Sequence, residues 1–358
     1  MLKAPFPWFG GKSRCASLVW ERFGDVPNYV EPFAGSLAVL LGRPTEAKNE
    51  TVNDKDAYLA NFWRALQADP CELARWADWP VNEADLHARH KWLVNRTGFK
   101  ERMLADPDYF DAKIAGWWVW GISMWIGSGW CQRTEWRGRG NASRHPRGLS
   151  AQLPDISGDG GAAGRGIFSK QAQKRPQIQK GGSGTNRSVQ QVRPHLQRDG
   201  QGVTQEAVRP LIGYFEFLAA RLRRVRVCCG EWDRILGPSP TTKIGLTGVF
   251  LDPPYSVEDR DDCYNEESRD VSHQVREWAI EHAADPLLRI ALCGYEGEHT
   301  MPDSWECIAW RANGGYANQK KEQTQGKKNA GRERIWFSPN CLRPGLFGFN
   351  EAGEMLVR

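Results

Sequence analysis

The stretch Gly248-Val249-Phe250-Leu251-Asp252-Pro253-Pro254-Tyr255 joins an apolar run to an acid, two prolines and a tyrosine. The apolar run predicts a buried strand, and the prolines end it, so Asp252 is expected at the carboxyl end of that strand. Open α/β sheets bind their ligands at this end of their strands. The stretch therefore predicts such a sheet with a functional edge, although an ordinary strand-end turn can have the same composition.

Asp252, Pro253, Pro254 and Tyr255 are candidate catalytic residues, because they supply what methylation of an exocyclic base amine needs. Such an amine is a poor nucleophile, since its lone pair is delocalised into the ring. The Asp252 carboxylate and the backbone carbonyl at Pro253 can each accept a hydrogen bond from the amine and orient its lone pair. Tyr255 can stack on the base. The tetrapeptide therefore favours transfer of a methyl group to a base amine.

The rest of the chain alternates strand patterns with helix patterns. Strands are expected at 28–33, 51–54, 225–229, 248–252, 287–293 and 334–338. Helices are expected from about residue 37, over most of 55–130, and at 211–222 and 271–283. This alternation on both sides of a central insertion predicts a Rossmann-like α/β fold with a doubly wound, mostly parallel sheet.

Residues 133–205 differ in composition from both flanks. The segment is rich in Gly, Arg, Gln and Ser and contains 13 Lys or Arg against 4 acids. Its charge balance is +9 in a chain whose net charge is +5, so the basic character is concentrated there. The composition favours a flexible insertion that binds a polyanion and orders on binding, with an expendable loop as the alternative.

The amino-acid composition predicts the cellular compartment and argues against a metal cofactor. The 358 residues are 40% hydrophobic and include 17 Trp, which suits a globular protein with large aromatic contact area. Nine Cys without a Cys-x-x-Cys pair or zinc spacing predict free thiols, a reducing cytoplasm and no metal site. The start of the chain does not read as a signal peptide. Residues 114–130 are short and broken by glycines, so a helix packed on the core is expected rather than a membrane span.

Residues 28–54 have the layout of a nucleotide-binding βαβ unit. The first strand leads into the turn Ala34-Gly35-Ser36, and the second strand ends on Asp54, 23 residues after Glu31. An acid at that place binds ribose hydroxyls in such units. The turn lacks the full Gly-x-Gly-x-x-Gly pattern, so the evidence for a nucleotide-binding turn is its position after the first strand.

Five motifs stand in one order: Pro7-Trp8-Phe9-Gly10-Gly11-Lys12, Val30-Glu31-Pro32-Phe33-Ala34-Gly35-Ser36, Val52-Asn53-Asp54, Val227-Cys228-Cys229-Gly230-Glu231-Trp232 and Asp252-Pro253-Pro254-Tyr255. Together they resemble the Dam-type, alpha-group DNA adenine methyltransferases, above all the phage and prophage versions. The resemblance covers about 5–65 and 206–340. The stretch between these ranges is where that family has its target-recognition region.

The resemblance implies a cofactor, S-adenosylmethionine, which leaves as S-adenosylhomocysteine, and a set of residues that hold its methionine part. The segment that would close over it contains Trp8, Gly10, Gly11 and Lys12, with Lys12 near the cofactor carboxylate. The residues that would line the methionine and sulfonium pocket are Glu31, Pro32, Phe33 and Gly35, where glycine allows close backbone approach.

For the nucleoside part of the cofactor, the resemblance implies that Asp54 accepts hydrogen bonds from the ribose. Glu231 would receive the adenine amine, and Trp232 would pack on that ring. Two positions depart from the family pattern. Leu37 replaces a glycine, so the turn must be wider or the helix must begin there. Glu231 replaces an aspartate, so Glu231 or the nearby Asp233 can take that role.

The implied enzyme is a site-specific DNA methyltransferase that flips adenine out of double-stranded DNA and methylates its exocyclic amine. Its catalytic domain is expected over 1–65 and 206–358, and its target-recognition insertion over 66–205. The expected phosphate-binding residues are Arg133, Arg137, Arg139, Arg144 and Arg147. A monomer or weak dimer without a membrane contact is expected, acting as a solitary modification enzyme or beside a separate restriction nuclease.

Two alternative functions are consistent with the same motifs. One is methylation of the cytosine N4 amine, which needs the same activation of an exocyclic amine. The other is a catalytically silent DNA-binding protein that keeps the methyltransferase fold. Asp at position 252 favours adenine by family resemblance, and the presence of all five motifs argues against a silent scaffold.

Overall fold

The computed structural model describes residues 2–8, 11–45, 48–125, 130–131, 205–255, 270–311, 331–343, 347–349 and 355–357. The flexible, basic segment expected within 133–205, with its five candidate arginines, lies outside the described residues except for its last residue, Gln205. Gly10 also lies outside them.

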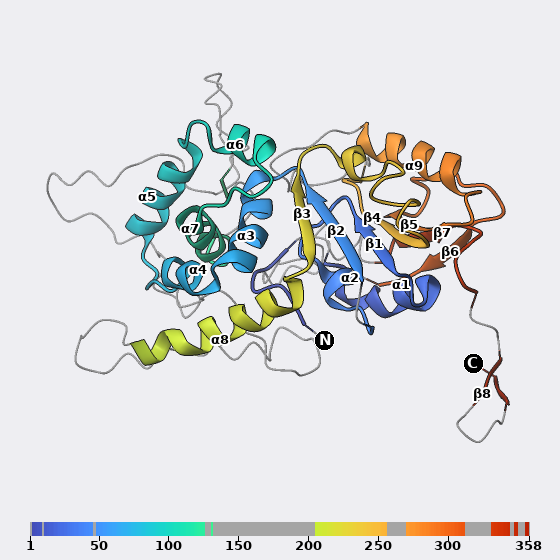
Figure 1. The fold of residues 1–358 in the computed structure, drawn as a ribbon, viewed down its shortest axis with the longest axis horizontal. Helices are drawn as coiled ribbons and strands as arrows, with labels where there is room; N and C mark the ends of the chain where they lie inside the picture. Colours follow the sequence, from blue (N-terminus) through green and yellow to red (C-terminus); the bar gives the residue numbers. More distant parts are fainter. Residues whose placement is uncertain are drawn as a thin grey trace, which may run out of the picture.

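A seven-stranded sheet forms the centre of the fold (Figure 1), with the order β3-β2-β1-β4-β5-β7-β6. Its strands are β1 (Asn28–Glu31), β2 (Asn49–Asp54), β3 (Val225–Cys229), β4 (Thr247–Leu251), β5 (Leu288–Tyr295), β6 (Glu306–Ala309) and β7 (Glu333–Phe337). The first five in this order pair in parallel, and β7 is antiparallel to both neighbours. The predicted mostly parallel sheet is confirmed.

Apolar side chains on both faces explain why β4 has a continuous hydrophobic run in the sequence. All five residues of β4 are buried. Phe250 packs in one hydrophobic cluster, whereas Val249 and Leu251 pack in the other. Such burial on both faces is typical of parallel strands covered by helices. Strand β6 was not expected from the sequence, and its four residues are half-buried or exposed.

The helices cover both faces and extend past one edge. They are α1 (Ala16–Phe23), α2 (Ala38–Leu41), α3 (Ala57–Ala68), α4 (Pro70–Ala77), α5 (Glu83–Val94), α6 (Phe99–Ala105), α7 (Ala112–Ile122), α8 (Gln205–Leu222) and α9 (Val271–His282), with 3-10 turns η1 (Lys12–Arg14) and η2 (Trp232–Ile235). Both α1 and α9 contact β5. Figure 1 shows α3 to α7 gathered beyond the β3 edge. A separate two-stranded sheet pairs β8 (Phe347–Phe349) with β9 (Met355–Val357).

The helical region expected over 55–130 is five short helices separated by capping residues. The Asp56, Asp69, Asn82 and Asp111 side chains each accept a hydrogen bond from a backbone N–H in the first turn of α3, α4, α5 and α7. Such caps satisfy donors that have no partner within the helix. Pro70 occupies the first turn of α4, where its missing N–H is not needed.

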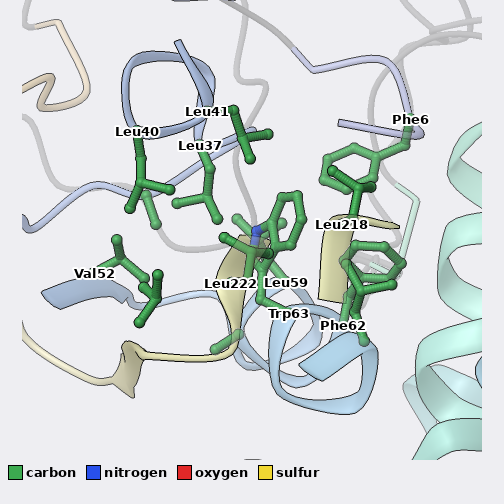
Figure 2. Close-up of a cluster of buried hydrophobic side chains, with 14 of the residues drawn as sticks. Phe6, Leu37, Leu40, Leu41, Val52, Leu59, Phe62, Trp63, Leu218 and Leu222 are labelled. Atoms are coloured by element: carbon green, nitrogen blue, oxygen red, sulfur yellow. The ribbon is translucent and has the colours of Figure 1, made fainter. Parts of the chain in front are cut away.

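A hydrophobic cluster joins this helical group to the sheet (Figure 2). Leu59 of α3 and Leu222 of α8 lie beside Leu37, which precedes α2. Trp63 is fully buried, and its indole N–H donates to the carbonyl of Gly35 at 3.1 Å. Helix α3, the first helix of the region expected over 55–130, therefore helps to hold the turn after β1 in place.

Helix α7 packs closely on α4 at Gly116. A Cβ atom at this position would stand 2.3 Å from the Cβ of Trp76 and 2.8 Å from its backbone carbonyl carbon. The tryptophans of α7 contribute to the same packing, and Trp118 and Trp120 are almost fully buried. No helix within the described ranges is long and apolar enough to cross a membrane.

Gly116→Ala is expected to lower the free energy of unfolding by about 1–3 kcal/mol, because the backbone of α4 must move to admit the methyl group. The matched control is Gly213→Ala in α8, where a Cβ atom meets nothing within 4 Å. That change is expected to be neutral or to stabilise by up to about 1 kcal/mol. Urea unfolding midpoints test the pair, and equal effects would contradict the close packing of α7 on α4.

Candidate functional site

The carboxyl ends of four neighbouring strands meet at one edge of the sheet. Glu31 ends β1 and Asp54 ends β2, while Glu231 and Asp252 follow β3 and β4 within two residues. The parallel registers align these ends, since Glu31 pairs with Val52 and Asp54 pairs with Cys229. Residues spread over more than 220 positions thus come together at the edge where ligands are expected.

A pocket of about 940 Å³, including its open mouth, lies at this edge. The residues expected from the sequence that line it are Trp8, Lys12, Glu31, Pro32, Phe33, Gly35, Asp54, Glu231, Trp232, Asp252 and Pro254. Of the expected residues, Gly11, Pro253 and Tyr255 do not line it. The lining residues that were not singled out are Ala34, Ser36, Ala38, Asn53, Lys55, Asp56, Gly230, Phe250 and Val271.

The turn after β1 lets the backbone approach the pocket closely. Gly35 has a φ of +46°, and a Cβ atom there would lie 2.7 Å from the indole nitrogen of Trp8. Leu37, at the position of the missing glycine, has a φ of +53° and precedes α2, which begins at Ala38. A left-handed backbone costs a leucine about 1–2 kcal/mol, and its complete burial offsets that cost. The turn keeps its left-handed geometry without the second glycine.

Asp54 faces the pocket with its carboxylate already oriented. Its Oδ2 accepts a hydrogen bond from the Gly35 N–H at 3.0 Å, and its Oδ1 accepts one from the Asp56 N–H at 2.9 Å. Burial and the neighbouring Asp56 carboxylate raise the pKa of Asp54 to about 7. Each oxygen has a second lone pair, so the oriented group can still accept hydrogen bonds from a ligand.

Glu31 is the most enclosed acid in the pocket wall, with 3% of its surface exposed. The hydroxyl of Tyr29 donates to its Oε2 at 3.0 Å. Burial raises the pKa of Glu31 well above its usual range. The adjacent Asn53 side chain donates to the carbonyls of Pro32 and Gly230, at 3.2 and 2.9 Å, and so ties the ends of β1 and β3 together.

Aromatic and charged groups also line the pocket. The rings of Phe33 and Trp232 are nearly parallel, at an interplanar angle of 21° and a centroid separation of 6.2 Å. Glu231 forms an exposed ion pair with Lys55 at 2.8 Å. Asp233, the other acid considered for the role of Glu231, is not part of the lining. The geometry therefore favours Glu231 as the acid beside these rings.

Asp252 lies in a compact cluster next to the pocket. The ammonium of Lys12 contacts its Oδ1 at 2.9 Å, and the hydroxyl of Tyr255 contacts the same oxygen at 3.2 Å. Lys12 is 5% exposed and lies 5.3 Å from the ring centre of Tyr255 and 5.7 Å from that of Trp310. The structure pairs Lys12 with Asp252, and the expected contact of Lys12 with a cofactor carboxylate stays a prediction.

Two thiols near Asp252 are poor nucleophiles. Burial raises the pKa of Cys15 to about 12 and the pKa of Cys293 well above its usual range. Both groups therefore stay protonated near neutral pH. Among the described residues, no group of three or more His, Cys, Asp or Glu is arranged to hold a metal ion. The cluster thus offers hydrogen-bond acceptors and a fixed cation rather than a covalent nucleophile.

The main omission of the sequence analysis is Glu333, at the start of β7. Its carboxylate accepts a hydrogen bond from the Tyr255 hydroxyl at 2.9 Å. Trp310, which follows β6, was also not singled out. Neither residue belongs to a motif, and both approach Asp252 only because β6 and β7 add to the far edge of the sheet. The neighbours of Asp54 could have been found, since Asn53, Lys55 and Asp56 flank it in sequence.

Comparison with known proteins gives a family match for the first part of the chain. Residues 8–105 match the family model described as D12 class N6 adenine-specific DNA methyltransferase. A search of curated proteins found no significant match. The matched range contains the Lys12 segment, the turn after β1 and Asp54, and the structure brings these together with Asp252, outside that range. The chain is therefore an adenine-specific DNA methyltransferase, for which S-adenosylmethionine is the methyl donor.

Proposed function

We propose that the chain binds S-adenosylmethionine in the pocket at the ends of β1, β2 and β3 and methylates a flipped adenine held at Asp252. The observation that carries this proposal is the position of Asp252, which lines the same pocket as Glu31, Asp54 and Trp232. A methyl donor in that pocket and an amine at Asp252 would stand side by side. Such placement is the main catalytic requirement of a direct transfer.

The pocket residues fit the three parts of the cofactor. Glu31 offers an acceptor near the cationic methionine end. At Gly35 the nearby Trp8 indole leaves room for backbone only, so no side chain projects from this position. Asp54 offers two oriented oxygens to the ribose hydroxyls. The parallel rings of Phe33 and Trp232 offer a flat apolar wall to adenine, with Glu231 next to them. When bound, the cofactor supplies an electrophilic methyl group on its sulfonium.

Asp252 is proposed to accept a hydrogen bond from the adenine amine. The contacts described above, from Lys12 and Tyr255, are both made to its Oδ1. The other carboxylate oxygen, Oδ2, is therefore the one proposed to receive the amine. The carbonyl of Pro253 is proposed as the second acceptor.

Base flipping has a cost that Tyr255 helps to offset. Extruding a base from the duplex costs a few kcal/mol. Stacking on an aromatic ring such as Tyr255 recovers about 1–3 kcal/mol. The Tyr255 ring is held edge-to-face by Tyr295, with centroids 4.6 Å apart. A fixed ring loses little conformational entropy when the base arrives, so more of the stacking energy is retained.

A direct test is transfer of a labelled methyl group to DNA, followed by digestion and nucleoside analysis. N6-methyldeoxyadenosine is the expected product. Detection of N4-methyldeoxycytidine would instead identify cytosine as the target base. Absence of transfer, with no thermal stabilisation by S-adenosylmethionine, would identify a silent scaffold. The adenine-specific description of the matched family favours the first outcome.

The basic segment is proposed to bind DNA phosphates through Arg133, Arg137, Arg139, Arg144 and Arg147. Replacing these five arginines with glutamine is expected to weaken DNA binding and to make it less dependent on salt. The slope of log affinity against log salt should fall by about 0.9 for each phosphate that is no longer neutralised. Cofactor affinity is expected to stay unchanged. The measurement is fluorescence anisotropy with labelled duplex DNA at several salt concentrations.

The matched control is the Arg223→Gln/Arg224→Gln variant. These exposed arginines lie just before β3, at the end of that strand opposite the pocket. They are expected to leave affinity and salt slope nearly unchanged. If the control and the five-arginine variant show the same reduction in slope, the effect is general charge attraction rather than a site in the insertion.

We propose further that the enzyme is of the Dam type and of phage or prophage origin, on the order of its five motifs. The proposed division assigns 1–65 and 206–358 to the catalytic domain and 66–205 to target recognition. A cytoplasmic monomer or weak dimer that works without a metal completes the proposal. Modification-sensitive sequencing of host DNA after expression would identify the recognition site and show whether modification occurs without a restriction nuclease.

A further inference from the structure

Asp252 and Glu333 share the hydroxyl group of Tyr255. The hydroxyl oxygen lies 3.2 Å from Asp252 Oδ1 and 2.9 Å from Glu333 Oε2. A phenol has a single proton to donate, so it can serve only one of the two carboxylates at a time. The shorter distance is to Glu333, which favours that acceptor. Asp252 is thereby spared one donor on the oxygen that already binds Lys12.

Glu333 is placed for this contact by the sheet rather than by the sequence. It starts β7 and pairs with Tyr295 of β5, and Tyr295 packs edge-to-face on Tyr255. Only 4% of Glu333 is exposed. A buried carboxylate needs compensating partners, and the Tyr255 hydroxyl and the nearby Lys12 cation supply them. No motif that defines the pocket requires an acid at this position.

We propose that ionised Glu333 is a positioning residue for methyl transfer: it accepts a hydrogen bond from the Tyr255 hydroxyl, holds the Tyr255 ring and leaves Asp252 to accept from the target amine. The inference rests on the proposed role of Asp252 and extends it. When Glu333 gains a proton, its carboxyl group becomes a donor toward the Tyr255 oxygen. The phenol proton then turns to Asp252 Oδ1, which already binds Lys12, and a carboxylate that accepts from both groups is a weaker acceptor for the amine at Oδ2.

The charge state of Glu333 depends on groups from every element packed around it. They are Lys12 and Cys15 at η1, Asp252 and Tyr255 after β4, and Cys293, Tyr295 and Glu298 on and after β5. Burial raises the pKa of Glu333, Asp252 and Glu298 add to the rise, and Lys12 and the Tyr255 hydrogen bond oppose it. Turnover should therefore fall on the acid side as Glu333 becomes protonated.

Glu333→Gln tests this proposal, because the amide resembles the protonated acid in shape and donor capacity. At saturating S-adenosylmethionine and DNA, kcat is expected to fall about ten- to hundredfold, as for loss of one hydrogen bond to a charged group. The KM for DNA and the Kd for cofactor should stay within about twofold. The acid-side decline that Glu333 causes in the wild-type pH profile should disappear. The exposed Glu296→Gln is the matched control and should change none of these values.

Tyr255→Phe gives a second test that does not alter the buried acid. Without the hydroxyl, Glu333 loses its hydrogen-bonded link to Asp252, so the acid-side decline should also be lost, and adding Glu333→Gln should lower kcat by less than about twofold. Additive losses, or a Glu333→Gln enzyme with wild-type kcat and an unchanged pH profile, would overturn the proposal. If Asp252→Asn keeps the wild-type rate, the role of Asp252 fails and the role of Glu333 fails with it. An inactive Asp252→Asn beside an unaffected Glu333→Gln refutes Glu333 alone.

Discussion

Asp252→Ala is expected to abolish detectable methyl transfer, with a loss of about 10²- to 10⁴-fold or more in rate. The carboxylate is the proposed acceptor for the adenine amine, and within the described residues it is the acid that lines the pocket on the β4 side. Cofactor binding should remain largely intact, because Glu31, Asp54 and Trp232 are unchanged. Tritium transfer from labelled cofactor to DNA measures the rate, and calorimetric titration measures cofactor affinity. A variant that keeps the wild-type rate would refute the assignment.

The ion pair with Lys12 makes a control necessary. Lys12 is 5% exposed, so removal of Asp252 leaves a buried cation with less compensation. Breaking a buried pair from one side costs about 3–5 kcal/mol, part of which Glu333 can offset here. Asp252→Asn keeps the volume and one acceptor oxygen, and Asp252→Asn/Lys12→Met removes both charges together. All three variants should be inactive, whereas the double variant should be more stable to heat than Asp252→Ala.

Asp54→Ala is expected to weaken S-adenosylmethionine binding by about 10²-fold or more. Each hydrogen bond to a charged acceptor contributes about 1.5–3 kcal/mol, and the proposed ribose contacts number two. The change also removes the oxygens that hold the Gly35 and Asp56 N–H groups, so the turn beside the methionine part loses support. The matched control is Asp233→Ala, an acid outside the pocket lining, which should bind cofactor normally. Similar losses in both variants would contradict the ribose role of Asp54.

Cofactor affinity should rise with pH near neutrality. Because the pKa of Asp54 is about 7, this acid gains a proton as the pH falls through this region, and the raised pKa of Glu31 acts in the same direction. Ribose hydroxyls and the cationic methionine end favour the ionised acids, so binding releases protons. Affinity should therefore increase from about pH 6 to about pH 8, and titration heats should depend on the buffer. An affinity that is flat over this range would count against the ribose role of Asp54.

The raised pKa of Asp54 makes the unliganded fold less stable as the pH rises, whereas it makes cofactor affinity increase. A carboxyl group whose pKa is raised by folding stabilises the native state below its unfolded pKa, and this contribution is lost as the pH rises through the folded value. For Asp54 the window runs from the ordinary pKa of 3.8 to a folded pKa of about 7. Above about pH 7 the unliganded protein therefore lacks this contribution of Asp54 to stability, whereas a bound ligand can interact with the ionised carboxylate.

Much of the site could be predicted from local patterns. Apolar runs that end in an acid or a Pro-Pro pair marked β1, β2 and β4 within a few residues, and parallel strands necessarily place such ends at one edge. Helix caps were less visible, because Asp56, Asp69 and Asp111 stand among many other acids. The region expected to be broadly helical therefore appeared as five helices with sharp breaks.

The sequence by itself determined the class of sheet, the order of the motifs and the acid proposed to activate the amine, because the strand and helix patterns and the motif residues follow directly from the order of residues along the chain. Only the tertiary structure decided that Lys12 pairs with Asp252 and that Glu333 shares the hydroxyl of Tyr255. These contacts join η1, the end of β4 and the first residue of β7, which are distant in sequence. Their formation depends on how β7 pairs antiparallel to β5, and no local pattern of residues encodes that pairing.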